Sequence, residues 1–399
     1  MNNQLKKYIL MTLKSVQTYI QDVLARGREY LSHRNEIKKF QNPRRVAIWS
    51  KVHLTKEQKT QIDQFYLKNY GQKVAHTWHR HYTAFTSNFD VKYFPELFYI
   101  PEFEHYLHSY NSAYTKAISD KNIISYLAQA IGVATPKVLC SRASGLFRDA
   151  TGNLLSLRDF QKLLGNIGEA FIKPSVDTSS GVGCAVIHMK DSKDMLSGKS
   201  ADTIIQELGD NFIVQERLIC HESLEILYPH SVNTFRIITY QWKDKILHTP
   251  IILRIGQGGH NVDNAHAGGM FIAVEEDGIL HQTAFTEFNQ QYTQHPDTHI
   301  TFKGYHIPYI SKLIEAAEHM HAFLPQCGIY NWDFTINKEG VPVLIEANIH
   351  GGSIWLAQMA HGKGIFGDNT ADILQWISFM KKLSPSKRKL YKPGYYSKS

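Results

Sequence analysis

The chain has 399 residues, of which 43% are hydrophobic and 20% are charged, and its formal net charge is +8. This composition indicates a folded globular protein with enough residues for two or three lobes, and the positive charge suits anionic ligands such as nucleotides, sugar phosphates or membrane surfaces. The four cysteines form no CxxC pair and the 21 histidines form no HExxH motif. A zinc ribbon and a disulfide framework are therefore disfavoured, a reducing cytoplasm is expected, and the histidines are interpreted as scattered core and surface residues. No run of 18 apolar residues is present, and the first residues do not have the pattern of a signal peptide.

Residues 2–40 are predicted to form one long basic helix, because apolar side chains recur at spacings of three and four. The lysines and arginines beside this apolar stripe suit a helix that lies on a membrane surface or binds a partner. The stripe also includes tyrosines and is broad enough to serve as a core face. We expect the helix to pack on its own domain, with peripheral membrane contact through residues 2–40 as the alternative.

The next predicted elements, in chain order, are a short strand at 45–50, a helix from the cap Thr55 to near Gly71, a segment rich in Tyr, Phe and His at 75–115, and a helix at 120–131. From Lys137 onward the chain changes to short β-rich runs. The predicted strands are 170–173, 182–189, 212–215, 233–242, 248–254, 270–275, 332–336 and 341–346. The predicted helices are 157–164, 201–208, 308–323 and 372–383. This mixture predicts α+β lobes with mainly antiparallel sheets, and the basic tail at 381–399 is predicted to be mobile.

The most specific pattern is an acidic β-hairpin that ends at Asn348. Two β-rich runs flank a turn at 337–340, and a loop of even length would place Asp333 opposite Leu344, with Glu346 as its diagonal neighbour on the same face. Two carboxylates and an amide oxygen, with a diagonal spacing of roughly 7–8 Å, suit Mg²⁺ that is shared with phosphates. The alternative is an ordinary half-exposed hairpin whose polar residues face outward.

Basic and glycine-rich segments form a second group of candidates. Lys173 ends a predicted strand and precedes a small-residue loop that reaches Gly183, and the backbone N–H groups of such a loop suit a polyphosphate. Arg236 and Arg254 each lie on a β-rich run, where arginine suits bidentate binding of a carboxylate or phosphate. The loop 256–269 combines glycines with hydrogen-bonding side chains, which is typical of close approach to a ligand. The alternative for the Lys173 loop is a plain surface hairpin. For Arg236 and Arg254 it is solvated charges at a sheet edge, and for the loop 256–269 it is a flexible surface loop.

Together these segments resemble the ATP-grasp superfamily, and within it the sugar-transfer-associated branch. The resemblance runs from about residue 95 to residue 368. It rests on the segments 120–122, the Lys173 loop, 215–218, 232–236, 253–256, 262–264, 268–269, 332–333 and 346–348. The first hundred residues match the superfamily's usual N-terminal lobe poorly, which leaves open whether an acceptor site lies there.

The resemblance implies a role for each matched residue. The implied catalytic and metal residues are Arg236 and Arg254, for the transferred phosphate or an acyl phosphate, and Asp333, Glu346 and Asn348, for two Mg²⁺ ions that Mn²⁺ can replace. The implied ATP contacts are the phosphate-binding Lys121 and Lys173, the flap residues Ser179, Ser180, Gly181 and Val182, the adenine hinge Gln215, Glu216, Arg217 and Leu218, and the ribose-binding Glu222.

The fold implied by the resemblance is an α+β ATP-grasp fold, in which two α+β lobes grip ATP and a helical extension precedes them. The predicted boundaries are a helical or mixed N-terminal region at 1–115, a small lobe with the phosphate flap at 116–210, a catalytic lobe with the metal hairpin at 211–380, and a basic tail at 381–399.

The implied activity is that of an ATP- and Mg²⁺-dependent carboxylate–amine or carboxylate–thiol ligase that forms an acyl phosphate, in the synthesis of cell-surface polysaccharides or sugar conjugates. The expected partners are a small-molecule carboxylate and an amine or sugar-linked acceptor, without nucleic acid. One alternative is a kinase, which leaves a phosphorylated product. Another is a nucleotide-binding scaffold that recruits glycosyltransferases to the membrane through residues 2–40. The presence of both lysines and both metal carboxylates argues against the scaffold.

Overall fold

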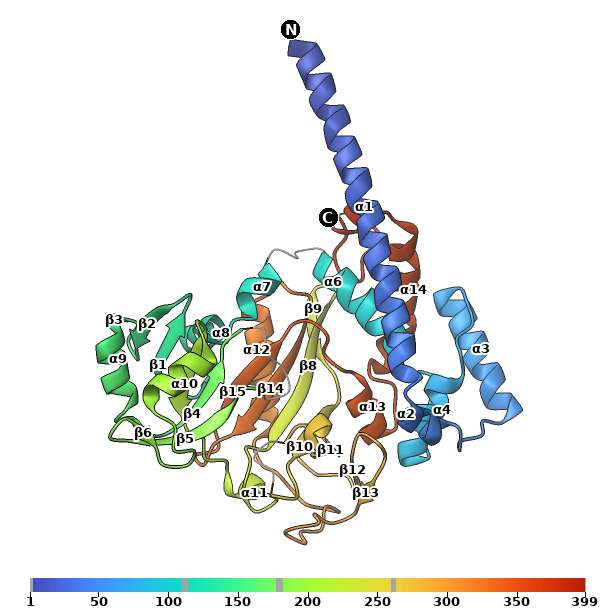
Figure 1. Ribbon diagram of the computed structural model, residues 1–399. Helices are drawn as coiled ribbons and strands as arrows, with labels where there is room; N and C mark the ends of the chain where they lie inside the picture. Colours follow the sequence, from blue (N-terminus) through green and yellow to red (C-terminus); the bar gives the residue numbers. More distant parts are fainter. Residues whose placement is uncertain (1–2, 110–113, 177–181, 260–262, 399) are drawn as a thin grey trace.

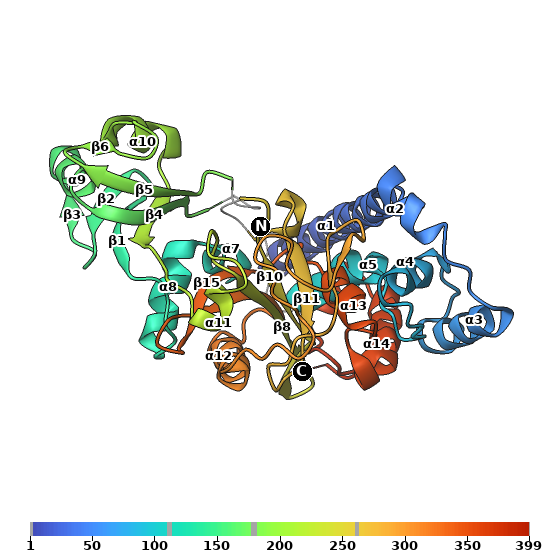
Figure 2. The same cartoon turned by 90° about the horizontal axis from the view of Figure 1, so that it is seen from below.

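Two antiparallel sheets and a set of helices around them form the molecule. A computed structural model describes residues 3–109, 114–176, 182–259 and 263–398. The smaller lobe lies at one end and the N-terminal helices at the other, with the larger sheet between them (Figure 1, Figure 2). The α+β class and the antiparallel sheets are as the sequence predicts.

The small lobe is a seven-stranded sheet in the order β3-β2-β1-β7-β4-β5-β6. Its elements are β1 (Val138–Ala143), β2 (Leu146–Asp149), β3 (Leu154–Leu155), α9 (Leu157–Leu164), β4 (Gly168–Pro174), β5 (Ala185–Lys190), β6 (Lys193–Asp194), α10 (Ala201–Leu208) and β7 (Phe212–Glu216). Both helices begin at a serine whose side chain accepts a backbone N–H of the first turn, and Phe160 and Ile204 pack in the core of the lobe. Because β7 lies at the centre of this sheet, the small lobe extends beyond the predicted boundary at residue 210.

The large lobe contains an eight-stranded sheet in the order β13-β12-β11-β10-β8-β14-β15, with β9 paired to β8. Its elements are α11 (Glu222–Glu225), β8 (Thr234–Trp242), β9 (Lys245–His248), β10 (Ile251–Ile255), a 3-10 helix (Ala265–Ala267), β11 (Met270–Val274), β12 (Ala284–Phe285), β13 (Gln291–Tyr292), α12 (Ile310–Phe323), β14 (Ile329–Ile336) and β15 (Pro342–Asn348). Every residue of β10, β11 and β14 is buried. Alternate residues of these strands face two separate cores, as Ile251 and Ile252 do, so both faces of the sheet are covered.

Helices from both ends of the chain cover the large sheet. They are α2 (Pro43–Trp49), α3 (Lys56–Tyr70), α4 (Thr77–Thr86), α5 (Glu96–Phe98), a π-helix (Tyr99–Glu104), α6 (His105–Ser109), α7 (Thr115–Ile118), α8 (Lys121–Ala130), α13 (Trp355–His361), a 3-10 helix (Gly367–Asn369), α14 (Thr370–Lys382) and α15 (Pro385–Arg388). α8 and α12 pack in the core on one face, while α13, α14 and the N-terminal helices pack in the core on the other. The helix that the sequence predicts between Thr55 and Gly71 is confirmed, with a capping box at Thr55 and Gly71 in the left-handed conformation.

The long N-terminal helix is confirmed as α1 (Asn3–Phe40), but the prediction that it packs on its own domain is wrong for its first half. This half projects away from the body of the molecule (Figure 1), and Leu10, Leu13 and Val16 are 65%, 60% and 51% exposed. From Lys6 onward, Asp22 is the first residue of α1 that is not exposed, and it accepts the backbone N–H of Ser386 at 2.7 Å. An apolar stripe alone does not specify what covers it. Within the described ranges, no helix combines the length and the hydropathy that a bilayer-spanning segment needs.

Two other predictions near the chain ends are wrong. The segment predicted as a strand at 45–50 belongs to α2, because Pro43 suits the first helical turn and the Asn42 side chain accepts the N–H of Arg44 at 2.9 Å. The tail predicted to be mobile is packed against the body as far as Tyr396, whose ring contacts Phe379, and residues 396–398 are exposed. Arg388 is 2% exposed and Trp376 Nε1 donates to the carbonyl of Tyr395 at 3.1 Å, so buried hydrogen bonds hold the basic tail in place.

Candidate active site

The hairpin of β14 and β15 brings its two carboxylates directly opposite each other. Asp333 pairs with Glu346 rather than with Leu344, and Asn331 pairs with Asn348. The prediction was wrong because the turn between Ile336 and Pro342 has an odd number of residues, and because a β-bulge after Asp333 shifts the pairing once more. Residues opposite each other in an antiparallel pair share one face, so both carboxylates lie on the same face of the sheet.

Two arginines hold Asp333. Arg236, its partner on β8, donates from Nε and Nη2 to Oδ1 and Oδ2 at 2.5 and 3.0 Å. Arg254 on β10 places Nη2 at 3.2 Å from Oδ2, and Asn348 Nδ2 lies at 3.3 Å from the same oxygen. Burial opposes ionisation of Asp333, but the two arginines outweigh it and keep the pKa of Asp333 below its ordinary value. The ionised carboxylate of Asp333 and the guanidinium groups of Arg236 and Arg254 therefore form a buried ion-pair cluster.

A threonine and an aspartate, which sequence analysis did not assign to the site, position Arg254. Thr234 Oγ1 accepts from Arg254 Nε at 3.0 Å and donates to Asp263. Asp263 Oδ2 also accepts the Thr234 backbone N–H at 3.0 Å and lies 3.6 Å from Arg254 Nε. Asp263 is in the glycine-rich loop that the sequence indicated as a ligand-approaching segment. In the structure its side chain instead anchors the end of β8 and orients an arginine.

Two lysines approach Glu346 from the small-lobe side. Lys121 opens α8 and its Nζ lies 3.2 Å from Glu346 Oε1, while Lys173 in β4 donates its Nζ to the Ile345 carbonyl at 3.3 Å. The Lys121 backbone N–H also donates to the Ser175 carbonyl at 2.9 Å. Both lysines are buried. Burial, assisted by the charge of Lys121, lowers the pKa of Lys173 to about 8 against the opposing attraction of Glu346.

Beside these lysines lie buried polar groups that have no hydrogen-bond partner in the described part of the chain. The unpaired atoms are the amide nitrogen and oxygen of Asn122 and the hydroxyl oxygen of Ser175. Asn122 is 2% exposed and Ser175 is 0% exposed. Buried polar groups are rarely left unpaired, so a polar ligand or water is expected there. Asn122 belongs to the segment 120–122, on which the family resemblance rests in part. Ser175 lies far from Lys121 in the sequence, and only the fold brings the two residues together.

The segment predicted as an adenine hinge links the two lobes. Gln215 and Glu216 belong to β7, and the Glu216 N–H donates to the Lys137 carbonyl at 2.9 Å. The backbone N–H of Glu216 is therefore already used. Arg217 forms an exposed ion pair with Glu169. Leu218 follows in the connection to the large lobe. The large lobe begins where Cys220 bridges to Asn337, in the turn of the β14–β15 hairpin.

The other predicted nucleotide contacts are less closely grouped. Glu222 is an exposed residue in the first turn of α11. Val182 is 67% exposed and precedes β5, which begins at Ala185 rather than at 182. Ser179, Ser180 and Gly181 lie outside the described residues. The lysines, arginines and hairpin acids are thus brought together, whereas three of the four predicted flap residues are not described.

The loop after Asn348 was not singled out from the sequence, although it borders the hairpin. A Cβ at Gly352 would lie 2.1 Å from Asn331 Nδ2, so a larger residue there would force the Asn331 side chain to move. Glu96 Oε1 accepts the backbone N–H groups of Ile354 and Trp355, each at 3.1 Å. The loop is therefore anchored to the N-terminal helices, which places residues far apart in the chain next to the hairpin.

A family model described as sugar-transfer associated ATP-grasp matches residues 102–372. No curated protein matches the chain in the sequence comparison. Structures similar to the chain include the D-Ala:D-Ser ligase VanG of Enterococcus faecalis, with a TM-score of 0.37 and 13% identity over 65% of this chain and 60% of that one. They also include the ATP-grasp ligase PsnB with a minimal precursor, with a TM-score of 0.39 and 12% identity over 67% and 63%. The chain thus spans less than two thirds of the length of either structure.

Proposed function

Because the chain belongs to the sugar-transfer associated ATP-grasp family, we propose that it is an ATP- and Mg²⁺-dependent carboxylate–amine (or carboxylate–thiol) ligase. One observation carries the proposal. Asp333 and Glu346 lie opposite each other, with two arginines on the first and a lysine on the second. This is a concentrated set of positive and negative groups of the kind that phosphoryl transfer requires.

The donor set fits Mg²⁺ better than a softer metal ion. Asp333, Glu346 and Asn348 offer carboxylate and amide oxygens, the ligands that Mg²⁺ prefers. We assign the two Mg²⁺ ions to these three residues, where the ions would offset the charge of the nucleotide phosphates. Asn348 Nδ2 donates to Asp333 Oδ2 at 3.3 Å, so the Asn348 amide lies next to the Asp333 carboxylate, which supports a shared site.

The cationic groups have separate roles in the proposed reaction. Lys121 and Lys173, on the small-lobe side, neutralise phosphate oxygens of ATP. Arg236 and Arg254 orient the transferred phosphoryl group. The substrate carboxylate attacks the γ-phosphorus, ADP leaves, and an acyl phosphate results. An amine or thiol then attacks the acyl carbon, the new bond forms, and inorganic phosphate leaves.

The substrate and pathway follow from the family description alone. We place the reaction in the synthesis of cell-surface polysaccharides or sugar conjugates, with a sugar acid or amino acid as the carboxylate and an amine or sugar-linked compound as the acceptor. Gln215 to Leu218, with Glu222, are the proposed contacts to adenosine, and the flap residues 179–182 are proposed to cover the phosphates.

Trapping of the acyl phosphate tests the proposal. The protein is incubated with ATP, Mg²⁺ and pools of carboxylates, with hydroxylamine as the nucleophile, and the products are separated by mass. We expect a hydroxamate, ADP and inorganic phosphate in equal amounts, and much smaller amounts of all three from Glu346→Gln. In a parallel incubation without hydroxylamine but with the amine or thiol acceptor pool, a stable phosphorylated product without inorganic phosphate would instead make the protein a kinase and overturn the ligase proposal.

A further inference from the structure

Two histidines and a glutamate meet at the end of β11, outside the proposed ATP site. Glu275 directly follows β11, and His281 lies on the returning chain of the same turn, where its backbone N–H donates to the Ala273 carbonyl at 3.0 Å. His361 is the last residue of α13, which packs against β11. One carboxylate oxygen and one nitrogen from each ring all lie within 4.8 Å of one another. The sheet and the helix therefore hold the three side chains together.

The buried member of this group, His361, directs a free lone pair toward the carboxylate. Its Nε2 lies 2.7 Å from the Ile251 carbonyl oxygen. Because a carbonyl only accepts, the proton of the ring is on Nε2, and Nδ1 keeps its lone pair. Nδ1 lies 3.8 Å from Glu275 Oε1, and the His361 side chain is 2% exposed. Among the described residues, this nitrogen has no hydrogen-bond partner, so a cation or a donor is needed between the two acceptors.

The charge states of these groups suit a metal ion. The hydrogen bond from His281 keeps the pKa of Glu275 below its ordinary value, so the carboxylate is ionised. Burial lowers the pKa of His361 to about 4, so its ring is neutral, which is the state in which imidazole binds metals. A histidine that ligates a metal commonly donates its other ring N–H to a backbone carbonyl, and His361 does so to Ile251.

The positions of the two rings fit a single ion. His281 Nε2 donates to Glu275 Oε1 at 2.5 Å, the same oxygen that His361 Nδ1 faces. The centroids of the two rings are 5.1 Å apart. Two imidazoles that bind one tetrahedral ion at about 2.0 Å have their centroids roughly 5 Å apart.

We propose that Glu275, His281 and His361 bind one divalent transition-metal ion of the Zn²⁺ class. Two imidazole nitrogens and one carboxylate form a set that binds Zn²⁺, Co²⁺ or Ni²⁺ better than Mg²⁺. As the ion binds, the proton between His281 and Glu275 leaves to solvent, and both atoms become ligands. The Glu275 side chain is 46% exposed, which gives the ion access and leaves a fourth position for water. The bound ion would fasten α13 to the turn after β11.

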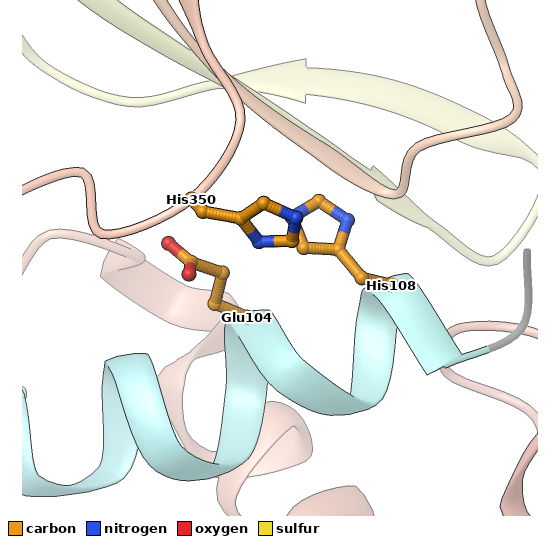
Figure 3. A group of neighbouring side chains, drawn as sticks. All are labelled: Glu104, His108 and His350. Atoms are coloured by element: carbon orange, nitrogen blue, oxygen red, sulfur yellow. The ribbon is translucent and has the colours of Figure 1, made fainter. Parts of the chain in front are cut away.

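A second group of the same composition, Glu104, His108 and His350, lacks these properties (Figure 3). The nitrogen of His108 that faces the other two, Nε2, already donates to the Ile349 carbonyl at 2.6 Å. Burial raises the pKa of Glu104 to about 8, so its carboxyl group is protonated at neutral pH. This group serves as an internal comparison for the experiment.

The test measures metal binding and requires no turnover. The full chain is stripped with a chelator, supplied with excess Mg²⁺ to occupy oxygen-ligand sites, and titrated with Co²⁺, whose visible spectrum distinguishes tetrahedral nitrogen ligation. We expect one equivalent of Co²⁺ with an intense tetrahedral band, and displacement by Zn²⁺. Zn²⁺ should also raise the midpoint of thermal unfolding, because it binds only the folded chain.

Matched variants make the result decisive. His281→Ala and Glu275→Gln, at partly exposed positions, should weaken Co²⁺ binding by more than about tenfold and remove the band, since even loss of an outer partner costs about 10–100-fold. Their folds are checked by circular dichroism. His350→Ala and the exposed His319→Ala should bind Co²⁺ as the unmodified protein does.

The exposed Lys363 supplies a variant that should change binding in the opposite direction. Its charge lowers the pKa of both Glu275 and His361, so it opposes a cation at the site. Lys363→Ala should therefore bind Co²⁺ at least as tightly as the unmodified protein. The proposal is overturned if no saturable band forms, if folded His281→Ala keeps the band, if His350→Ala alone loses it, or if Lys363→Ala binds more weakly. The first outcome would mean that the ion pair of His281 and Glu275 needs no metal.

Discussion

Asp333 and Glu346 occupy directly opposite positions on β14 and β15, yet each is held by cations from a different part of the chain. Arg236 and Arg254 of the large sheet bind Asp333, while Lys121 of α8 binds Glu346. Two like charges at opposite positions of an antiparallel pair destabilise it. The cations offset this repulsion, and the nucleotide and its metal ions are proposed to compete for the same groups.

Replacement of Glu346 by Gln should reduce turnover by about 10²–10³-fold, because one charge that is proposed to hold the metal ions is lost at the transition state. The fold should remain intact, since Glu346 is partly exposed and Gln has nearly the same shape. The measurement is kcat for ADP release, with thermal unfolding as a check. Glu339→Gln, in the exposed turn of the same hairpin, is the control. Turnover of Glu346→Gln equal to that of the control would remove Glu346 from the active site.

Lys173→Ala should weaken a non-hydrolysable ATP analogue by roughly 10- to 100-fold, since a charge-assisted hydrogen bond contributes about 1.5–3 kcal/mol. Calorimetric titration of the analogue measures the effect. Lys190→Ala, on the neighbouring β5 and exposed, should bind the analogue as the unmodified protein does. Equal affinities for all three proteins would contradict a phosphate contact at Lys173.

The affinity for the analogue should also fall as pH rises above 8, because the pKa of Lys173 is lowered to about 8 by burial. Below that pH the ammonium is charged and ready for phosphate. Above it, binding must first restore the proton, so affinity falls by up to about tenfold per pH unit. Titrations between pH 6.5 and 9.5 measure the slope. Lys173→Arg, which stays charged, should remove the dependence, and a slope that persists in this variant would point to another group.

Thr234→Val should lower kcat by roughly tenfold, because it removes the hydroxyl between Arg254 and Asp263 while it keeps the volume. KM for ATP should change little, since the threonine positions Arg254 rather than the adenosine. Thr234→Ser restores the hydroxyl and should restore kcat. If the serine variant stays as slow as the valine variant, the loss comes from packing and not from the position of Arg254.

Removal of residues 1–20 should leave the midpoint of thermal unfolding and the activity unchanged, because residues 6–20 are exposed and the hydrogen bonds of Asp22 to Ser386 are kept. The removed segment combines exposed aliphatic side chains with Lys6, Lys7 and Lys14 and has no acidic residue. We expect the full chain to sediment with anionic vesicles, and the shortened chain to stay in solution. Binding should weaken in 1 M salt, where the Debye length is about 3 Å. Vesicle binding that survives the deletion would contradict this role of α1.

Local patterns in the sequence determined most elements and indicated many of the candidate site residues. Thr55 and Gly71 mark the two ends of α3, because a capping box and a left-handed glycine depend only on neighbouring residues. The alternation of apolar and polar residues in the hairpin identified β14 and β15. Lys173 and Arg236 were identified by residue type together with the resemblance to a family.

Only the tertiary structure decided how these parts meet. The register of Asp333 depends on a bulge whose position is set by the pairing of β14 with both neighbours. The surroundings of α1, the contact of Ser175 with Lys121 and the meeting of His108 with His350 join segments that lie far apart in the chain. Side-chain periodicity shows which face of an element is apolar or charged, but it contains no information about which distant segment covers that face. That choice depends on the free energy of the whole packed molecule.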